Sequence, residues 1–412
     1  MTERNVLSLF TGAGGLDLGF ETAGFAIRLC VEVDEDARKT LKLNRPSWML
    51  AEPADIHVVD PSSLLRQAGL RKGTLTLLAG GPPCQPFSKS GYWSNGDSRR
   101  LRDPRSNTLH AFLQVVEATL PHVLLLENVE GLGFDGKDEG LQLIKDQIKV
   151  VNRRRRTRYK PQVIYINAAD YGVPQIRKRV FIVASVDGRT LEMPDPTHGE
   201  RHGCEPYRSS WDAIADLDTV VWPQELKPSG KWSALLPSIP EGQNYLWHTP
   251  RNEAIGGTPL FGWRARYWSF LLKLAKNKPS WTIQAEPGPA TGPFHWKSRL
   301  LSIKELCRLQ TFPNDYMIEG SIRSARRQVG NAVPSAIGEL LGLEIRRQLL
   351  GEKVRRRLRL IPTRRDDCPS PESVTRVSLK YLPLRSSHKD HLGPGLGPGA
   401  RRAIQSQVSI ER

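Results

Sequence analysis

The sequence predicts a doubly wound α/β fold with a smaller, mostly β domain inserted into it. At the start of the chain, the apolar run 6–10 leads through the glycine-rich turn 11–15, TGAGG, into an amphipathic helix over 16–23. Short apolar runs then alternate with helical periodicity as far as 185, and that pattern returns only at about 297. Strands and helices in alternation, opened by a glycine turn, are typical of doubly wound sheets.

Each expected element follows from a local pattern. The expected strands are short apolar runs bounded by turns, at 6–10, 27–33, 74–79, 122–126, 163–167 and 179–185. The expected helices have apolar residues at helical spacing, at 16–23, 34–44, 108–120, 141–151, from 302 onward and up to about 349. Asp34 stands where it can cap the second helix, and Ser302 with Glu305 forms a capping-box pattern.

Composition limits the kind of partner. A formal net charge of +17 and a pI near 9.8 favour a polyanion such as nucleic acid, with a basic surface kept for solubility as the alternative. No apolar run approaches ~18 residues, so we expect no membrane span. The N-terminus lacks the pattern of a signal peptide, so we expect a cytoplasmic protein. The five scattered cysteines argue against a disulfide framework.

The glycine turn 11–15 lets the backbone approach a ligand closely, as phosphate- and nucleotide-binding turns do. Its G-x-G-G spacing differs from the G-x-G-x-x-G of nicotinamide dehydrogenases, which disfavours that activity. Glu32 lies at the end of the second strand, about twenty residues past the glycines, where an acidic side chain can hydrogen-bond ribose hydroxyls.

A candidate nucleophile follows the strand 74–79. The segment 80–88, GGPPCQPFS, uses two glycines and three prolines to form a stiff turn around Cys84. A thiol on a rigid turn beyond a strand can have a lowered pKa and a fixed direction of attack. The alternative is a free cysteine in a proline-rich loop. The polar stretch 89–107 then carries several Lys and Arg residues and reads as a loop.

Two further groups of charged residues accompany this turn. Glu127 ends the predicted strand 122–126, where doubly wound sheets place their sites, and a buried acid there needs a partner. Arg177 and Arg179, in the pattern Q-x-R-x-R, point to one face of an extended segment. Their alternative role is an ordinary charge pair at a strand edge.

In this order, these motifs resemble those of the DNA cytosine-5 methyltransferases of bacterial restriction–modification systems. The resemblance covers about 1–185 and 297–350, and it implies S-adenosylmethionine as methyl donor. It implies a catalytic set of Cys84, Glu127, Arg177 and Arg179. The cofactor contacts that it implies are Phe10, Thr11, Gly12, Gly14, Gly15, Leu16, Glu32, Val33, Asp55, Ile56, Pro82, Asn331 and Val333. The implied substrate contacts are Gln85, Ser88, Asn128 and Gln175.

The resemblance further implies a reaction on a cytosine that is flipped out of duplex DNA. The Cys84 thiolate would add to C6, C5 would take the methyl group, and Glu127 would stabilise the charge that develops at N3. Arg177 and Arg179 would hold the pyrimidine. The implied partners are double-stranded DNA and a restriction endonuclease acting on the same site. We expect a monomer, located in the bacterial cytoplasm with the nucleoid.

The insert, 186–296, contains eight of the ten tryptophans together with many prolines and glycines. The resemblance implies that it is the target-recognition domain, which reads bases from the major groove. The alternative for most of the tryptophans is that they fill the core of a small domain. His198, His202 and Cys204 lack a fourth ligand at suitable spacing, so we expect no metal.

Two basic segments lie outside these motifs. The run 153–158, RRRRTR, follows a helix that leads back to a strand, so we expect it at the edge of the sheet opposite the active site. The tail 351–412 has no periodicity; from 353 on it carries 14 Lys and Arg against 5 Asp and Glu, a net of +9. We expect this tail to be disordered and to bind phosphates loosely.

Two rival functions remain at this point. An RNA cytosine-5 methyltransferase would use nearly the same motifs on tRNA, but the large tryptophan-rich insert favours DNA. A non-catalytic DNA- or cofactor-binding regulator would not need Cys84, Glu127 and both arginines intact. The sequence does not define the bases that are recognised.

Overall fold

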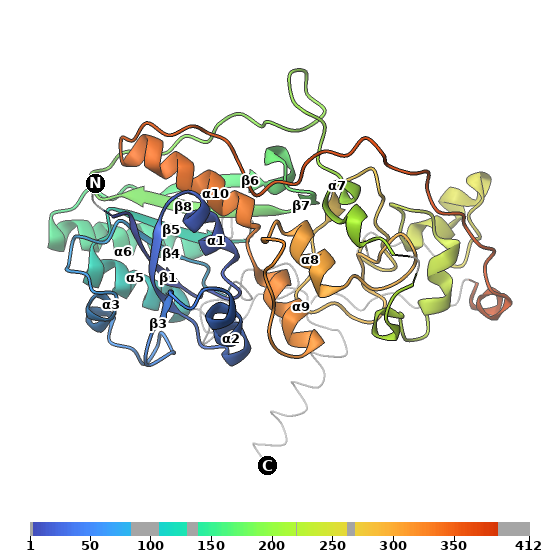
Figure 1. Cartoon of the computed structure of the whole chain (residues 1–412), viewed down its shortest axis with the longest axis horizontal. Coiled ribbons are helices and arrows are strands. Elements are labelled where there is room, and N and C mark those ends of the chain that lie inside the picture. The colour runs from blue at the N-terminus through green and yellow to red at the C-terminus, as the bar shows by residue number, and fades with distance from the viewer. Residues whose placement is uncertain (1–2, 84–106, 130–138, 220, 262–267, 386–412) are drawn as a thin grey trace, which may run out of the picture.

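A computed structural model of the chain describes residues 3–83, 107–129, 139–219, 221–261 and 268–385. It contains an α/β part, on the left of Figure 1, and an irregular part built by the insert, on the right. A seven-stranded sheet in the order β3-β2-β1-β4-β5-β8-β6 forms the centre of the α/β part. Its strands are β1 (Asn5–Leu9), β2 (Ala26–Val31), β3 (Met49–Leu50), β4 (Leu77–Gly80), β5 (Val123–Asn128), β6 (Gln162–Asn167) and β8 (Lys178–Ser185).

The strands β1 to β5 are parallel, and β8 runs antiparallel to both β5 and β6. The six predicted strands are confirmed, whereas the two-residue β3 escaped notice because it is too short to show periodicity. The strand order reverses between β1 and β4, which is the point where doubly wound sheets bind their ligands. The fold class predicted from the sequence is therefore confirmed for the α/β part.

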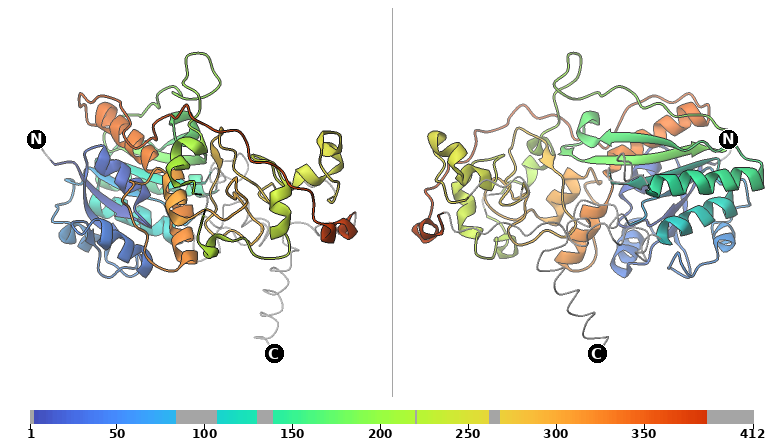
Figure 2. Two further views of the ribbon diagram at one scale, coloured as in Figure 1. Left: turned by 45° about the vertical axis from the view of Figure 1, so that its right-hand side comes forward. Right: turned by 180° about the vertical axis from the view of Figure 1, so that it is seen from behind.

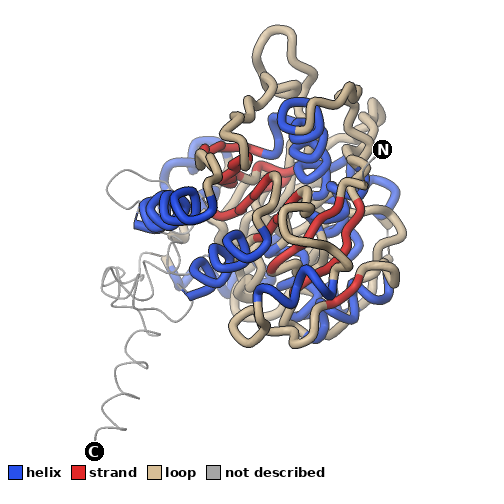
Figure 3. Tube along the Cα trace, turned by 90° about the vertical axis from the view of Figure 1, so that its left-hand side faces the viewer, coloured by secondary structure: helices blue, strands red, loops and turns tan. Residues whose placement is uncertain are grey.

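Helices cover both faces of the sheet, as Figure 3 shows end-on. The helices of this part are α1 (Gly15–Thr22), α2 (Glu35–Asn44), α3 (Pro61–Gln67), α5 (Asn107–Thr119), α6 (Glu139–Arg155) and α10 (Ser335–Glu344). Successive side chains along a strand point to opposite faces of the sheet, so each packs into the apolar core on its own face. Val6 packs with α1 and α10, while its neighbour Leu7 packs with α3, α5 and α6. Two separate apolar cores therefore hold the sheet.

Small residues bring α1 and α10 into close contact. A Cβ atom on Gly19 would lie 2.2 Å from the carbonyl oxygen of Ser335, and one on Gly338 would lie 2.3 Å from that of Leu16. Only glycine fits at either position. The far end of the chain is thereby fixed against the helix that follows the glycine turn.

The predicted helix caps are both present. The Asp34 carboxylate accepts a hydrogen bond of 3.0 Å from the backbone N–H of Ala37, as an N-cap does. Ser302 and Glu305 form the capping box at the start of α8 (Ile303–Leu309), which is followed by α9 (Ile322–Asn331). These local patterns could be predicted because each involves residues close in sequence.

The insert differs from the mostly β domain expected from its sequence. Its described residues form short helical turns, loops and a single strand, β9 (Ser280–Trp281), which pairs with β7 (Gln175–Ile176). The turns are α7 (Ser210–Ile214), η6 (Ala215–Leu217), η7 (Gln224–Leu226), η8 (Ser233–Ser238), η9 (Tyr245–His248) and η10 (Pro250–Ile255). Frequent prolines and glycines explain this, because they interrupt strand pairing. Outside the insert, similar turns are η5 (Ala168–Tyr171), η12 (Ile345–Leu349) and η13 (Leu379–Leu384).

The prediction of a disordered tail is wrong for residues 351–385, which we call the strap. In Figure 1 this orange-to-red segment runs from α10 across both parts of the molecule to the far end of the insert. The backbone N–H groups of Arg359 and Leu360 donate to Glu339 of α10. Further along, the N–H of Arg365 donates to the carboxylate of Asp212 in α7 over 2.7 Å.

The strap then becomes part of the insert. The buried ammonium of Lys276 donates 2.6 Å to Glu241 and 2.9 Å to Glu372 of the strap. Tyr381 is only 2% exposed, stacks on Trp232, and belongs to the same apolar core as the insert's own residues. The strap lacks periodicity because its contacts are long-range ones with two surfaces, and sequence patterns do not reveal these.

The strap should therefore contribute to stability. Tyr381→Ala would remove a buried ring and leave a cavity, which costs about 3 kcal/mol in unfolding free energy. Leu379→Ala, on the same turn but with a 79% exposed side chain, is the matched control and should change it little. Urea unfolding of both variants measures the difference. Equal stability of the two variants would show that the strap does not complete the core.

Candidate active site at the carboxyl edge of the sheet

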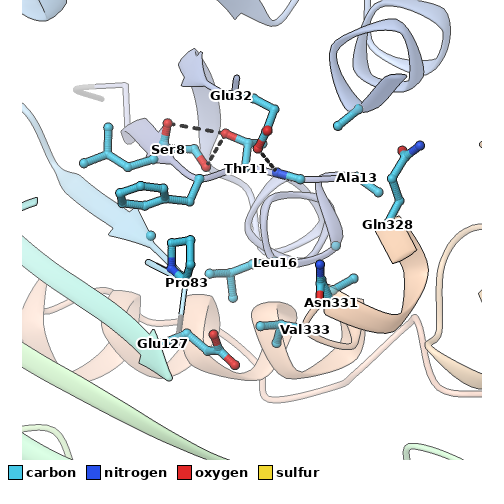
Figure 4. A pocket seen from close by; sticks show the side chains of 18 of the residues that line it. Ser8, Thr11, Ala13, Leu16, Glu32, Pro83, Glu127, Gln328, Asn331 and Val333 are labelled. Carbon is cyan, nitrogen blue, oxygen red and sulfur yellow. Dashed lines mark hydrogen bonds between the residues drawn. The ribbon is translucent and has the colours of Figure 1, made fainter. Parts of the chain in front are cut away.

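A cavity of about 340 Å³ lies beyond the carboxyl ends of β1, β2, β4 and β5 (Figure 4). Its volume falls in the range of small-molecule sites. Segments that are far apart in sequence form its wall, namely 8–13, 15–17, 32–34, 37, 80–83, 127, 129, 179, 327–328 and 330–333. The cavity is thus assembled by the fold and is not a property of one loop.

The glycine turn forms one wall, and its glycines have different tasks. Gly12 has φ +56°, and a Cβ there would meet nothing within 4 Å, so its role is conformational. A Cβ on Gly15 would lie 2.4 Å from the carbonyl oxygen of Val333, so that glycine permits close approach. Gly14 has φ +77° and faces Leu41, away from the cavity. Of the glycines predicted as cofactor contacts, Gly12 and Gly15 line the cavity.

Glu32 is held in a fixed orientation at the cavity wall. One carboxylate oxygen accepts a hydrogen bond of 2.7 Å from the backbone N–H of Gly12 (Figure 4), and the other accepts one of 2.8 Å from that of Asp34. Burial raises the pKa of this carboxyl, and these N–H donors oppose the rise. Each carboxylate oxygen can accept more than one hydrogen bond, so acceptor capacity remains for ligand hydroxyls.

Several other predicted contacts also line the cavity: Phe10, Thr11, Leu16, Val33, Pro82, Asn331 and Val333. Phe10 has φ 55°, an unusual conformation for a bulky residue that is often kept at functional sites. The predicted adenine contacts Asp55 and Ile56 are not among the cavity residues. The Asp55 carboxylate accepts from the N–H of His57, and Ile56 packs against the core. Their ligand roles stay predictions.

Glu127 and Arg179 form an ion pair at the opposite wall. Nε of Arg179 lies 2.9 Å from Oε1 of Glu127, and both side chains are mostly buried. Burial raises the pKa of the Glu127 carboxyl, while the guanidinium groups of Arg179 and Arg177 oppose the rise. A Cβ on Gly81 would lie 3.0 Å from Oε2 of Glu127, so the turn after β4 packs directly on this carboxyl.

Cys84, Gln85 and Ser88 lie outside the described residues. The last described residues before them, Pro82 and Pro83, line the cavity together with Glu127. The structure therefore brings the start of the candidate nucleophile turn to the wall where the carboxyl lies, and the position of the thiol itself stays a prediction.

Arg177 occupies a different place from the predicted pyrimidine contact. It is 1% exposed and does not line the cavity. Its guanidinium donates to the backbone carbonyls of Ile283 at 3.2 Å, Gly330 at 2.8 Å and Ala332 at 2.8 Å. These bonds join the end of the insert to the last turn of α9 and the residue after it, so the geometry gives Arg177 a positioning role.

Asn128 and Gln175, predicted as substrate contacts, are likewise buried among protein atoms. Asn128 donates to the carbonyl of Pro82 over 3.4 Å. The Gln175 amide donates to Gln310 and accepts from the N–H of Ile283, each over 3.1 Å. Both side chains position loops around the cavity.

Among the cavity residues that the sequence analysis missed, three have polar side chains with defined partners. Gln328 accepts from Thr40, and Arg327 pairs with Asp34 over 2.6 Å, so both tie α9 to α2. Asp17, in the first turn of α1, is 1% exposed, and burial raises its pKa to about 7 against an opposing hydrogen bond with Ser8. The sequence signal that could have revealed Asp17 is an acidic residue within the otherwise apolar run LDLGF.

The described residues contain no group of three or more His, Cys, Asp or Glu side chains that could hold a metal ion. No helix in the described ranges is both long and apolar enough to cross a bilayer.

The cavity suits an uncharged or cationic organic ligand with hydroxyl groups, because Glu32 and backbone groups provide its polar lining.

A doubly wound sheet with a glycine turn and an acid-lined cavity at its switch point is the arrangement in which such folds bind nucleotide cofactors. A solved structure with this fold is the Entamoeba histolytica methyltransferase EhMeth, at a TM-score of 0.55 and 15% identity, covering 85% of this chain and 99% of that one. The chain belongs to the C-5 cytosine-specific DNA methylase family, whose pattern it matches over residues 4–347. It is therefore a DNA cytosine-5 methyltransferase of a family that uses S-adenosylmethionine.

Named relatives agree with this assignment. The Type II methyltransferase M.SacI of Streptomyces achromogenes is 37% identical over 377 residues, covering 84% of this chain and 94% of that protein. The Type II methyltransferase M.NgoFVII of Neisseria gonorrhoeae is 32% identical over 335 residues, covering 80% and 83%. The cavity fits the family's cofactor, because Glu32 faces it as a hydroxyl acceptor and the glycine turn leaves room for close approach.

The buried Asp17 gives a pH-dependent prediction. Its pKa is about 7 in the folded chain against an ordinary 3.8, so the folded state keeps a proton that the unfolded state releases between these values. The free energy of unfolding should fall as pH rises through this window, by at most roughly 4 kcal/mol. Asp17→Asn should remove that fall. Urea unfolding at about pH 5 and about pH 8 measures it, with the exposed Asp315→Asn as control. An equal pH slope in wild type and Asp17→Asn would contradict the assignment.

Proposed function

We propose that this enzyme methylates C5 of a cytosine flipped out of a specific duplex DNA sequence, through a transient bond between Cys84 and C6. The observation that carries the proposal is the Glu127–Arg179 pair at the cavity wall, next to the prolines that lead into Cys84. A carboxyl, a guanidinium and the start of the nucleophile turn meet beside a cofactor-sized cavity. This set of groups suits addition to a pyrimidine ring.

The chemistry follows from the weak nucleophilicity of cytosine C5. The Cys84 thiolate gives an electron pair to C6, and the C5–C6 double-bond pair becomes available at C5 to form the new bond. Bound S-adenosylmethionine supplies the methyl group from its sulfonium. A base then removes the C5 proton, the double bond re-forms, and the thiolate leaves.

Glu127 would stabilise the ring during addition. Burial raises the pKa of its carboxyl, so a proton is retained at higher pH than in water and can be donated towards N3. Arg179, bound to the same carboxyl, fixes its orientation and keeps it from being ionised alone in an apolar wall. Arg177 does not touch the ring in this proposal; it positions the cavity wall by binding the backbone carbonyl of Gly330.

Access to the ring requires base flipping, since the stack of a duplex covers both faces of a cytosine. We propose that the insert, 186–296, contacts the duplex and offsets part of the unstacking cost, as a target-recognition domain does. Four of its ring systems, including Trp232, Tyr245 and Phe261, pack against one another in its core. These rings serve stability, which leaves surface side chains for reading bases.

We also propose that the enzyme protects DNA within a restriction–modification system, because the relatives described above are Type II methyltransferases. A restriction endonuclease acting on the same site, action as a monomer, and a place with the bacterial nucleoid belong to this proposal.

Cys84→Ser tests the nucleophile. Because a hydroxyl is far less ionised than a thiol, transfer of tritiated methyl groups to duplex DNA should fall at least ~10³-fold while cofactor binding is kept. Cys368→Ser, a change at an exposed cysteine of the strap, is the control and should be fully active. Including tRNA as a competing substrate distinguishes an RNA methyltransferase. Near-wild-type transfer by Cys84→Ser would remove the covalent mechanism.

Glu127→Gln tests the proton donor. The amide keeps the shape of the side chain but cannot transfer a proton, so turnover should fall ~10²- to 10⁴-fold. Affinity for S-adenosylmethionine, measured by calorimetry, should change less than threefold by a rough estimate, because the ion pair lies across the cavity from Glu32. Unchanged turnover would show that N3 is stabilised by another group.

A further inference from the structure

The edge of the sheet opposite the cavity carries a dense group of basic side chains. We call it the rear patch. It consists of Arg71, Lys72, Arg153, Arg154, Arg155, Arg156, Arg158, Lys160 and Arg189, all of them exposed. Figure 3 looks onto this edge, and the right-hand view of Figure 2 shows the end of α6 on the side of the sheet away from the insert.

Backbone hydrogen bonds hold the loops of the rear patch together. The N–H of Gly73 donates to the carbonyl of Thr119 over 3.0 Å. The N–H of Arg158 donates to the carbonyl of Val186 over 2.9 Å, and the Asn152 side chain bonds both backbone groups of Tyr159. The cations therefore project from a rigid base formed by four neighbouring loops.

Few carboxylates neutralise this patch. Glu117 lies 3.7 Å from Arg154 and 3.3 Å from Arg155, and Asp187 pairs with Arg189. In the part of the chain that the structure describes, the other six side chains form no ion pair: Arg71, Lys72, Arg153, Arg156, Arg158 and Lys160. The helix dipole of α6 favours positive charge at its C-terminal end, which would explain one or two of the arginines in its last turn. It does not explain the basic residues on the other loops.

Arg156 shows that the charge is kept at a conformational cost. It follows the end of α6 with φ 57°, the left-handed conformation in which helices usually place glycine. A non-glycine residue there costs roughly 1–2 kcal/mol. A side chain placed so, within a cluster of unpaired cations, indicates an anionic partner.

The partner must be reached separately from the catalytic duplex. The rear patch and the cavity lie at opposite ends of the strands. The six residues of β5 span about 20 Å, which is therefore the distance between the two sites. Duplex DNA has a persistence length of about 150 bp, so the segment held at the cavity cannot bend around to this edge over a few turns. We propose that the rear patch binds the phosphate backbone of a second segment of duplex DNA while the first is held at the active site.

Such a second contact would allow direct transfer between DNA segments during the search for a site. Each neutralised phosphate releases counterions, which steepens the logarithmic salt dependence of binding by about 0.9. Replacing Arg71, Arg153, Arg156 and Arg158 by Gln should therefore make the salt dependence of non-specific binding shallower by about 3.6 if each contacts a phosphate. A matched loss of charge is offered by Arg355, Arg357, Arg364 and Arg376, which are exposed on the strap.

The direct test measures dissociation from a labelled duplex while unlabelled competitor duplex is added. Wild type and the strap variant should release the label faster as competitor concentration rises, because the second segment binds before the first leaves. The rear-patch variant should release the label at a rate that does not depend on competitor concentration. At high competitor concentration this rate should be at least ~5-fold slower than that of wild type. Methylation of a short duplex with one site should be equal in all three proteins.

Three results would overturn the proposal. One is competitor-independent release from wild type, and another is equal behaviour of the rear-patch and strap variants. The third is acceleration by tRNA but not by duplex DNA, which would assign the surface to another polyanion. Thermal unfolding of each variant shows whether the fold is kept, so that a loss of function through misfolding is recognised. None of these outcomes depends on Cys84 or on the mechanism of methyl transfer.

Discussion

The cavity depends on the buried guanidinium of Arg177. This one group binds carbonyls at the end of the insert and at both ends of the short segment that closes the cavity, around Gly330 and Ala332. Hydrogen bonds from a charged donor contribute about 1.5–3 kcal/mol each, and a buried cation without acceptors would be strongly unfavourable. The cation therefore ties the segment around Gly330 and Ala332 to the β7–β9 pair. The Gln310 amide, which donates to the carbonyls of Val329 and Ala332, helps it to hold the wall that faces the glycine turn.

The order of segments along the chain makes such a tie necessary. The sheet is complete by Ser185, yet the cavity is closed only by residues near 330, after the whole insert has intervened. The two-residue pairing of β9 with β7 is the insert's only strand pairing among the described residues, so its attachment needs further contacts. Arg177 holds it from within, and the strap holds it from outside through the Lys276–Glu372 ion pair and the Tyr381 ring. Both contacts join residues more than ninety positions apart.

That separation decides what the sequence could predict. The glycine turn, the place of Glu32 and the caps at Asp34 and Ser302 depend on neighbours within one or two turns of chain, and local patterns predicted them. The burial of Arg177, the acid at Asp17 and the order of the strap depend on partners far away in sequence. A guanidinium that binds carbonyls and one that lines a cavity can have the same sequence pattern, so residue type alone could not separate Arg177 from Arg179.

The direction of the strands also separates two electrostatic environments. Glu32 and Glu127, the acids that we propose for the ribose hydroxyls and the pyrimidine N3, both line the cavity at the carboxyl edge. Negative charge there opposes DNA phosphates, and the cations of the rear patch lie at the opposite ends of the strands, on the amino edge. At physiological salt the screening length is about 8 Å, far shorter than the ~20 Å through the sheet. The rear patch therefore cannot tune the active-site carboxyls through space, and any influence on methylation must act through DNA that it touches directly.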